Sequence, residues 1–279
     1  MTYFYYRISD NSYRKEKLVD KVDCLSNFLE VFTNLEGTIL ADNCDQSTIS
    51  MIENLISGKD IQLVKSKKGN AGALKKCIDL AIQNLKENDL VYFVEDDYLH
   101  HYKANQFLKS WDRSIMQDVS YATFYDHPDK YSCLYGNGET SKVYCDKIHW
   151  RETQSTTMTF FTKVKELKLD YSIWLEHTSE NHPRDHEIFT KILNENHYRG
   201  KLICAIPGLA VHTDLTVSAG LRQVLFEDWA LELVEQILFD KLGEIDIDLK
   251  RTILNRPKGW SRIQLIRAIL SSSCVVNKD

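Results

Sequence analysis

The chain has 279 residues, of which 43% are hydrophobic and 27% are charged, and its formal net charge is -5. This composition is ordinary for globular proteins, and the length allows one large domain or two modest ones. The mild negative charge argues against general electrostatic binding to nucleic acid, which needs a basic surface. We therefore expect no nucleic-acid partner.

Cysteine usage and the first residues bear on the compartment. Seven cysteines are scattered along the chain without a CxxC pair, so neither a zinc knuckle nor a thioredoxin-like site is indicated. Free thiols of this kind are typical of a reducing compartment. The opening MTYFYYRISD reaches Arg7 after too few apolar residues for a signal peptide, and no later stretch is apolar enough to span a bilayer. These features predict a cytoplasmic protein.

Strand-like and helix-like patterns alternate along the N-terminal part of the chain. Short runs rich in aromatic and β-branched residues predict strands, and apolar residues at intervals of three and four predict helices. The predicted strands are TYFYYRI (2–8), GTILADN (37–43), IQLVKS (61–66) and DLVYFVEDD (89–97). The predicted helices are residues 15–33, a segment capped by Asp45 that carries Ile49, Ile52 and Ile56, and a segment that follows Gly69.

The rest of the chain is less regular. Residues 120–165 read as mixed strands and loops, and a helix is predicted to begin near Asp185. The run KLICAIPGLAVHTD (201–214) predicts a strand pair around Pro207, and residues 221–242 predict a further helix.

Strand–helix alternation predicts an α/β fold in which helices cover both faces of a parallel sheet. In such sheets ligands bind beyond the carboxyl ends of the strands. Three predicted strands end in polar residues: RISDNS (7–12), ADNCD (41–45) and EDD (95–97). We expect these three ends to face one crevice.

The triplet Glu95, Asp96 and Asp97 ends an apolar strand directly. Hard carboxylate oxygens suit Mg²⁺ or Mn²⁺, and such a cation would remove the repulsion between the three charges. In an extended chain Glu95 and Asp97 would point one way and Asp96 the other. The alternative is an acidic turn exposed to solvent.

Residues 67–99, KKGNAGALKKCIDLAIQNLKENDLVYFVEDDYL, resemble the nucleotide-sugar half of GT-A-fold glycosyltransferases, particularly the inverting family 2-like enzymes. In that family a Gly/Asn-rich turn opens a helix, and the next strand ends in a DxD-type motif, spelled VEDD here. The segments RDHEIF and PGLAVH are similar to those that supply the family's catalytic base and a late histidine of its metal site. The resemblance is good over about the first hundred residues and thin afterwards.

The resemblance implies a GT-A fold, with a Rossmann-like, mostly parallel sheet flanked by helices and a C-terminal helical extension. Residues 1–110 would form the nucleotide-sugar-binding half, 111–220 the acceptor-binding and catalytic half of the same domain, and 221–279 the extension.

The resemblance also implies site roles. Asp97 and His212 would bind Mn²⁺ or Mg²⁺, and Asp185 would be the general base. The nucleotide-sugar pocket would be lined by Arg7, Ser9, Asp10, Asp42, Asn70, Gly72, Glu95 and Asp96. Two alternatives stay open: a structural histidine at position 212 and an aspartate that stabilises a helix start at position 185. The family's Glu-Asp pair reads Arg184-Asp185 here, which leaves the base assignment open.

The implied activity is metal-dependent inverting transfer of a sugar from a nucleotide-diphosphate donor, most simply a UDP-sugar, to a hydroxyl of a glycan or lipid-linked acceptor. One alternative is a sugar nucleotidyltransferase, although RISDNSYRK lacks the glycine-rich loop that it needs after the first strand. Another is a non-catalytic nucleotide- or sugar-binding module on the same fold.

All charged residues from Lys250 to Arg267 are positive, and apolar residues are interspersed among them. Such a segment can lie on an anionic membrane, here the inner membrane face, or can pack on the catalytic domain.

Overall fold

The computed structural model of the chain describes residues 1–10, 19–111, 119–126, 143–145, 148–179, 182–195 and 201–213, and short helical pieces at 229–230, 232–234 and 236–237. The predicted basic segment, the tail beyond residue 245 and most of the helix predicted over 221–242 lie outside the described residues.

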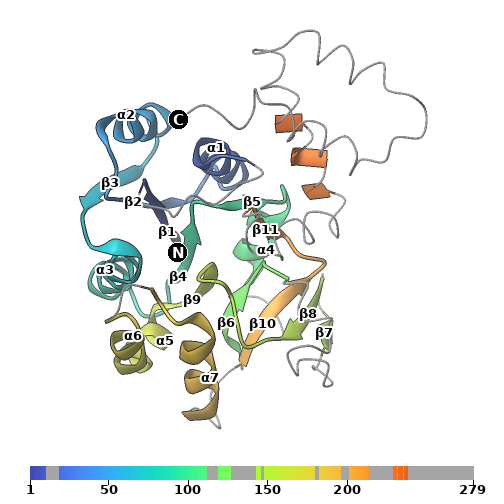
Figure 1. Cartoon of the computed structure of the whole chain (residues 1–279). Coiled ribbons are helices and arrows are strands. Elements are labelled where there is room, and N and C mark those ends of the chain that lie inside the picture. The colour runs from blue at the N-terminus through green and yellow to red at the C-terminus, as the bar shows by residue number, and fades with distance from the viewer. Residues whose placement is uncertain are drawn as a thin grey trace, which may run out of the picture.

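One large sheet organises the described part of the chain, with strand order β3-β2-β1-β4-β9-β6-β10-β8-β7 (Figure 1). Its strands are β1 (Thr2–Ser9), β2 (Glu36–Asp42), β3 (Ile61–Ser66), β4 (Leu90–Glu95), β6 (Val119–Thr123), β7 (Val143–Cys145), β8 (His149–Glu152), β9 (Phe160–Lys163) and β10 (Lys201–Ile206). The strands β1 to β4 are all parallel, and β6 pairs parallel with β10. By contrast, β9, β8 and β7 pair antiparallel. The sheet is therefore parallel in its first half and mixed in its second.

Helices cover both faces of this sheet. One face carries α1 (Lys21–Val31), α2 (Gln46–Leu55) and α4 (Ala104–Ser110), and the other carries α3 (Gly69–Asn84), α5 (Val164–Leu169), α6 (Tyr171–His177) and α7 (Asp185–Glu195) (Figure 1). Each face has its own buried apolar cluster, one around Phe28 and Tyr92 and the other around Phe160 and Trp174. The predicted α/β class, with a central sheet flanked by helices, is confirmed.

The predicted strands and helices of the first hundred residues are all present. Asp45 caps α2 by accepting a hydrogen bond from the Thr48 amide at 2.8 Å, as predicted. The described helix α1 begins only at Lys21, because Asp20 caps it by accepting from the amides of Val22 and Asp23. The segment 11–18, where the predicted helix was to start, lies outside the described residues.

A second, two-stranded sheet was not predicted in this form. It pairs β5 (Tyr98–His100) with β11 (Ala210–His212), antiparallel. The strand β4 ends at Glu95, and Asp96 and Asp97 form a turn into β5. The expectation of a continuous extended chain through Asp97 was therefore wrong, because the chain bends to enter this second sheet.

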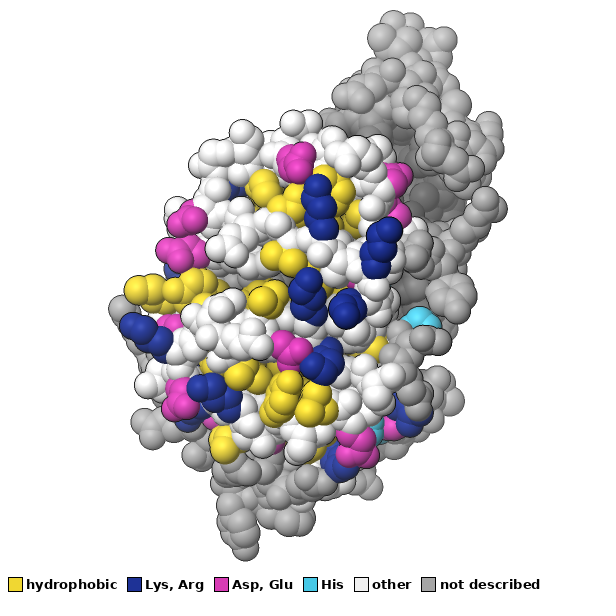
Figure 2. Space-filling view, turned by 90° about the vertical axis from the view of Figure 1, so that its left-hand side faces the viewer, with side chains coloured by type: hydrophobic (Ala, Val, Ile, Leu, Met, Phe, Trp, Pro, Cys, Tyr) yellow, Lys and Arg dark blue, Asp and Glu magenta, His cyan; other side chains and the backbone are white. Residues whose placement is uncertain are grey.

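The edge strand β3 lies on the side of the molecule that faces the viewer in Figure 2. On this side Lys and Arg side chains are spread among apolar ones. Lys65, on the strand, and Lys67 and Lys68, just after it, are all exposed. Charged side chains on an exposed edge hinder strand-to-strand association. None of the helices in the described ranges combines the length and apolar character that crossing a bilayer requires.

Candidate functional site

The strand register brings the polar strand ends together at the carboxyl edge of the sheet. In the parallel ladder Ser9 is opposite Asp42, and Arg7 is opposite Glu95. Parallel strands present their carboxyl ends at the same edge, which is where ligands bind in α/β sheets. The expectation that these three strand ends face one region is confirmed for the described residues.

The acidic turn, defined as Glu95, Asp96 and Asp97, is largely buried rather than solvated. Asp96 and Asp97 are 9% and 5% exposed, and the Glu95 side chain is 20% exposed. Buried carboxylates need donors or opposite charges in reach. The Ser9 amide donates to Asp96 Oδ2 at 3.0 Å, so the end of β1 supplies one of these donors.

Arg7 neutralises the first residue of the acidic turn. Its Nη2 lies 2.6 Å from Glu95 Oε1, and its Nη1 donates to Asn70 Oδ1 at 2.8 Å and to the Asn70 carbonyl at 3.2 Å. The Arg7 side chain is itself 6% exposed. Arg7 thus ties the ends of β1 and β4 to the first turn of α3, and three predicted pocket residues are in mutual contact.

His212 approaches the last residue of the acidic turn from a distant part of the chain. Its Nε2 lies 3.3 Å from Asp97 Oδ2, and both side chains are buried. The approach is a consequence of the β5–β11 pairing, in which His212 is opposite Tyr98 and the Thr213 amide donates to the Asp97 carbonyl at 2.8 Å. The two predicted metal ligands therefore lie side by side.

The donor chemistry of this pair can be tested against Mn²⁺ and Mg²⁺. Within the described ranges no group of three or more His, Cys, Asp or Glu side chains is arranged to hold a metal ion. Mg²⁺ is usually bound through one or two carboxylates, with waters and substrate phosphates completing its coordination, and imidazole favours Mn²⁺ over Mg²⁺. One carboxylate and one imidazole fit a cation shared with a diphosphate, but not a site formed by protein groups alone.

Opposing charges act on the first carboxylate of the acidic turn. Burial raises the pKa of Glu95, and the negative charges of Asp97 and Asp96 act in the same direction. Arg7 and His212 oppose this rise. The acidic turn, Arg7 and His212 are therefore one electrostatic unit, in which added positive charge would be stabilising.

Asp42 holds the turn between β3 and α3. Its Oδ1 accepts from Ser66 Oγ at 2.5 Å and from the Lys68 amide at 2.7 Å, while its Oδ2 accepts from the Gly69 amide at 2.9 Å and from Asn43 Nδ2 at 2.8 Å. Gly69 has φ +73°, which glycine adopts without strain. Asp42 thereby lies at the positive N-terminus of α3, where its hydrogen bonds stabilise the turn. None of these bonds involves a ligand, so its predicted contact with a nucleotide base stays a prediction.

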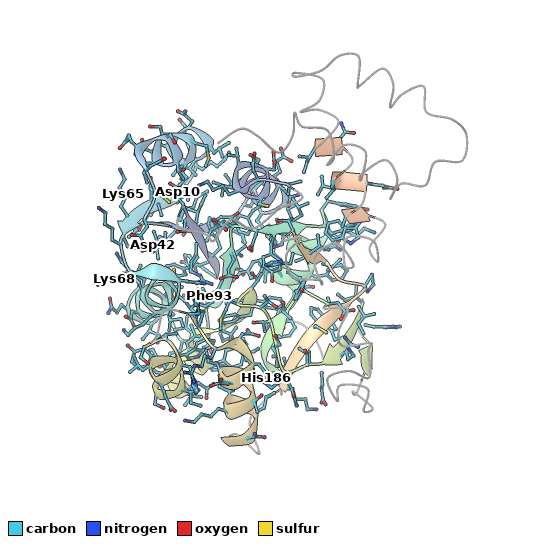
Figure 3. The ribbon with its side chains drawn as sticks, viewed as in Figure 1. Asp10, Asp42, Lys65, Lys68, Phe93 and His186 are labelled. Atoms are coloured by element: carbon cyan, nitrogen blue, oxygen red, sulfur yellow. The ribbon has the colours of Figure 1, made fainter. Side chains whose placement is uncertain are left out.

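Two further predicted pocket residues can be placed beside Asp42. Gly72 lies in the first turn of α3, where an added Cβ would be 2.9 Å from Lys68 Cβ, so this position requires glycine for packing. Asp10 turns towards α1 and α2: it accepts from the Asp45 amide at 2.6 Å and from Thr48 Oγ1 at 2.9 Å, and it pairs with Lys21. In Figure 3 the labelled Asp10 and Asp42 lie towards the end of the sheet that carries β3, between α2 on one face and α3 on the other.

Asp185 is the first residue of α7, and the segment before β9 encloses its carboxylate. Oδ2 accepts from Ser155 Oγ and from the Thr156 amide, the latter at 2.9 Å. Oδ1 accepts from Thr156 Oγ1 at 2.7 Å and from the Met158 amide at 3.2 Å. We call residues 155–158 the Asp185 loop. Two successive non-glycine residues of this loop, Thr157 and Met158, have left-handed φ angles of 49° and 57°.

The Asp185 loop and the residue after it contact the acidic turn and the residue that follows the turn. The Glu95 amide donates to Thr159 Oγ1 at 3.3 Å, just after the loop, and the Tyr98 hydroxyl donates to the Thr157 carbonyl at 3.3 Å. The predicted base therefore lies on the same side of the sheet edge as the predicted metal ligands. His186, labelled in Figure 3, follows Asp185 on α7.

Sequence reasoning missed Tyr98 and the Asp185 loop. Tyr98 is fully buried between the ring of His212, 5.0 Å away, and the ring of Tyr125, 5.5 Å away. The only sequence signal for Tyr98 was its position directly after an acidic triplet. The polar run TQSTTMT (153–159) was the signal for the loop, because Ser and Thr offer many donors to a carboxylate.

Comparison with known proteins gives structural likeness at low identity. No protein-family model matches the chain, and no curated protein sequence matches it. Among solved structures, the chain is similar to residues 1–349 of S. aureus TarS, with a TM-score of 0.49 and 11% identity over 92% of this chain and 76% of that one. A structure of the same fragment in complex with UDP-GlcNAc gives a TM-score of 0.47 and 14% identity, over 72% of this chain and 55% of that one.

HddC from Yersinia pseudotuberculosis gives a TM-score of 0.45 and 10% identity, over 76% of this chain and 93% of that one. With identities and TM-scores this low, these likenesses decide nothing about the function of the chain. Function is therefore inferred from the residues of the site.

Proposed function

We propose that the protein is an inverting glycosyltransferase that uses a nucleotide-diphosphate sugar and a divalent cation. The observation that carries this proposal is the contact of Asp97 with His212 at the carboxyl end of β4, beside the Arg7–Glu95 pair. Three carboxylates held this close together repel one another, even with Arg7 against Glu95 and His212 against Asp97, and an added positive charge would reduce that repulsion. A cation bound to a donor diphosphate would supply that charge.

Separate groups of residues would bind the donor and the acceptor. Asp97 and His212 would hold Mn²⁺ or Mg²⁺, which supplies Lewis-acid stabilisation of the leaving diphosphate. The nucleotide would lie between β1, β4 and α3, where Arg7 contacts Asn70 and the Ser9 amide contacts Asp96, with Gly72 in the first turn of α3. Glu95, with one oxygen held by Arg7, has its second oxygen for a sugar hydroxyl or for water near the metal.

Asp185 is the proposed general base. Inverting transfer requires a carboxylate that takes the proton of the attacking acceptor hydroxyl on the face opposite the leaving group. Thr157 of the Asp185 loop contacts Tyr98, and Thr159, just after the loop, contacts Glu95, so this carboxylate would lie near the proposed donor site. The acceptor would be a glycan or lipid-linked hydroxyl, and a UDP-sugar is the simplest donor.

The hydrogen bonds of Asp185 also support a second candidate function, a non-catalytic binding module. Its carboxylate already accepts four hydrogen bonds from the Asp185 loop. A carboxylate offers about four lone-pair sites, so an acceptor hydroxyl must displace one of these donors. A non-catalytic module that binds a nucleotide sugar at the same crevice would need no such exchange.

Ligand binding and turnover distinguish the two functions. A thermal-shift screen of nucleotide sugars, each with and without Mn²⁺, should reveal one donor that stabilises the protein only when Mn²⁺ is present. Release of the nucleoside diphosphate from that donor should then be measured for wild type, Asp97→Asn, Asp185→Asn and the exposed control Asp60→Asn. Turnover that is lost in the first two variants and retained in the control supports the transferase. Binding without turnover in wild type supports the module, and full turnover in Asp97→Asn refutes the metal assignment.

A further inference from the structure

Tyr98 stands between the two parts of the proposed catalytic site. It is the first residue of β5, directly after the acidic turn, and it is fully buried. Its ring contacts the imidazole of His212, and its hydroxyl contacts the Asp185 loop. Neither the donor chemistry nor the proton transfer described above uses this residue.

The ring of Tyr98 determines how His212 can lie. The two residues are directly opposite in the β5–β11 ladder, and their rings are 5.0 Å apart at an interplanar angle of 78°. Tyr125 closes the other side of Tyr98 at 5.5 Å and 85°. Edge-to-face contacts of this kind restrict ring rotation, and groups around a ligating histidine set its orientation. With the Tyr98 ring in place, His212 Nε2 faces Asp97.

The hydroxyl of Tyr98 acts on the other part of the site. It donates to the carbonyl of Thr157, which lies between the two residues whose amides donate to Asp185, Thr156 and Met158. Thr157 and Met158 hold left-handed backbone angles, which persist only where surrounding contacts fix them. A tyrosine hydroxyl is protonated at neutral pH and can donate this hydrogen bond.

We propose that Tyr98 is a positioning residue with two separate tasks: its ring sets the His212 imidazole against Asp97, and its hydroxyl holds the Asp185 loop. This inference rests on the proposed function, because it assigns the two tasks to metal binding and to proton transfer. The tasks belong to different atoms, so two substitutions separate them. Tyr98→Phe removes only the hydroxyl, and Tyr98→Leu removes the ring as well.

The matched control is Tyr121→Phe. Tyr121 is also a buried tyrosine, and its hydroxyl donates to Asp170 at 2.8 Å within the apolar cluster on the α6 side of the sheet. The partner in that hydrogen bond is not one of the proposed site residues. The hydroxyl also accepts from Trp174 Nε1 at 3.4 Å, so its loss tests the general effect of removing a buried, hydrogen-bonded tyrosine hydroxyl.

Titration with Mn²⁺ in the presence of saturating UDP, together with steady-state transfer kinetics, gives the expected split. Tyr98→Phe should bind Mn²⁺ within about twofold of wild type and lose about tenfold in kcat, because only the loop is released. Tyr98→Leu should also lose Mn²⁺ affinity by about 10- to 100-fold, the usual effect of removing a group that orients a ligand. Tyr121→Phe should leave both quantities within about twofold of wild type. Unchanged Mn²⁺ affinity in Tyr98→Leu, or equal kcat in Tyr98→Phe and Tyr121→Phe, would overturn the proposal.

A metal-free measurement separates this proposal from the proposed function. The imidazole NMR signals of His212 should shift in Tyr98→Leu and stay in place in Tyr98→Phe, since only the former removes the ring. If wild type neither binds Mn²⁺ nor acts on a nucleotide sugar, the proposed function fails, and these signals still decide whether the Tyr98 ring positions His212. Identical His212 signals in wild type and Tyr98→Leu would refute that positioning.

Discussion

The end of β4 and the start of α7 both present carboxylates at the same edge of the sheet, but they hold them in opposite ways. At the end of β4, three carboxylates lie close together, and Arg7 and His212 are among the side chains that contact them. At the start of α7, a single carboxylate accepts four hydrogen bonds from uncharged groups of the Asp185 loop. The first arrangement concentrates like charge, and the second disperses a single charge over dipoles.

The two arrangements differ in their effect on the free energy of the folded protein. Like charges in a buried cluster raise the free energy of the folded protein, and they persist where a ligand repays that cost. A carboxylate enclosed by amide and hydroxyl donors stabilises the local structure with no ligand present. A cation bound at the acidic turn would therefore reduce the repulsion within it, whereas the hydrogen bonds of Asp185 stabilise its loop with no ligand.

Asp97→Asn gives the sharpest test of this contrast and the largest expected effect. Without the carboxylate, the Mn²⁺-dependent release of the nucleoside diphosphate should fall about 1000-fold, comparable to the loss of a group that stabilises transition-state charge. The metal-free unfolding free energy should be equal to or above that of wild type, because one of three repelling charges is removed. Denaturant unfolding without metal, alongside the kinetics, checks both. A variant that keeps a tenth of the activity, or that unfolds much more easily, would contradict the contrast.

Asp185→Asn should show the opposite pattern in stability. The amide nitrogen must face an N–H of the Asp185 loop in either orientation, at Thr156 or at Met158. Leaving such a donor without its charged acceptor should lower the unfolding free energy by about 3 kcal/mol. Urea unfolding at pH 7 measures this, with Asp60→Asn as the control that leaves stability near wild type. Stability equal to that control would mean that the loop does not depend on the carboxylate.

The parallel half of the fold could be predicted because its signals are local. Alternating apolar runs, the Asp45 cap and the glycine before α3 each lie within one element, and parallel pairing then fixes where the strand ends meet. For the same reason Arg7 and Glu95, at two strand ends, could be expected in one region, whereas Asn70 was assigned to it by the resemblance. Their contacts follow from the register of β1 with β4.

The acceptor side could not be predicted in the same way, because its contacts join distant segments. The β5–β11 pair brings Tyr98 against His212, and each of its strands is only three residues long. So short a run carries no periodic signal. The placement of Asp185 depends on the left-handed turn at Thr157 and Met158, which no glycine or asparagine announces. The resemblance supplied His212 and Asp185, and the fold supplied their neighbours.

Asp42 extends the comparison to the nucleotide side, where the predicted effect is smaller. Like Asp185, it accepts from four uncharged donors, here around the start of α3. Asp42→Asn should therefore lower the unfolding free energy by about 2 kcal/mol, because an amide group then faces the Lys68 or Gly69 N–H. Denaturant unfolding checks this against Asp60→Asn. If stability is unchanged while nucleotide affinity falls, Asp42 belongs with the ligand-dependent carboxylates instead.

Glu95 gives the smallest effect, which appears as a pH dependence. Its pKa in the folded protein is raised above the ordinary value of 4.5, first by burial. The folded state therefore holds this proton more readily than the unfolded state, and the metal-free protein should lose stability as the pH rises above 4.5. The contribution is at most about 1.4 kcal/mol per pH unit across the interval between the two pKa values.

In Glu95→Gln the contribution of this residue to the slope of stability against pH should disappear. The substitution also weakens the contact with Arg7, which changes the stability at a given pH but does not restore that slope. The exposed residue Glu87 provides the control Glu87→Gln, which should keep the wild-type slope. Saturating Mn²⁺ should flatten the wild-type curve as well, because a bound cation favours the charged form of the acidic turn. Wild type and Glu95→Gln with parallel stability curves between pH 4.5 and pH 7 would show that the acidic turn carries no strain for a cation to relieve.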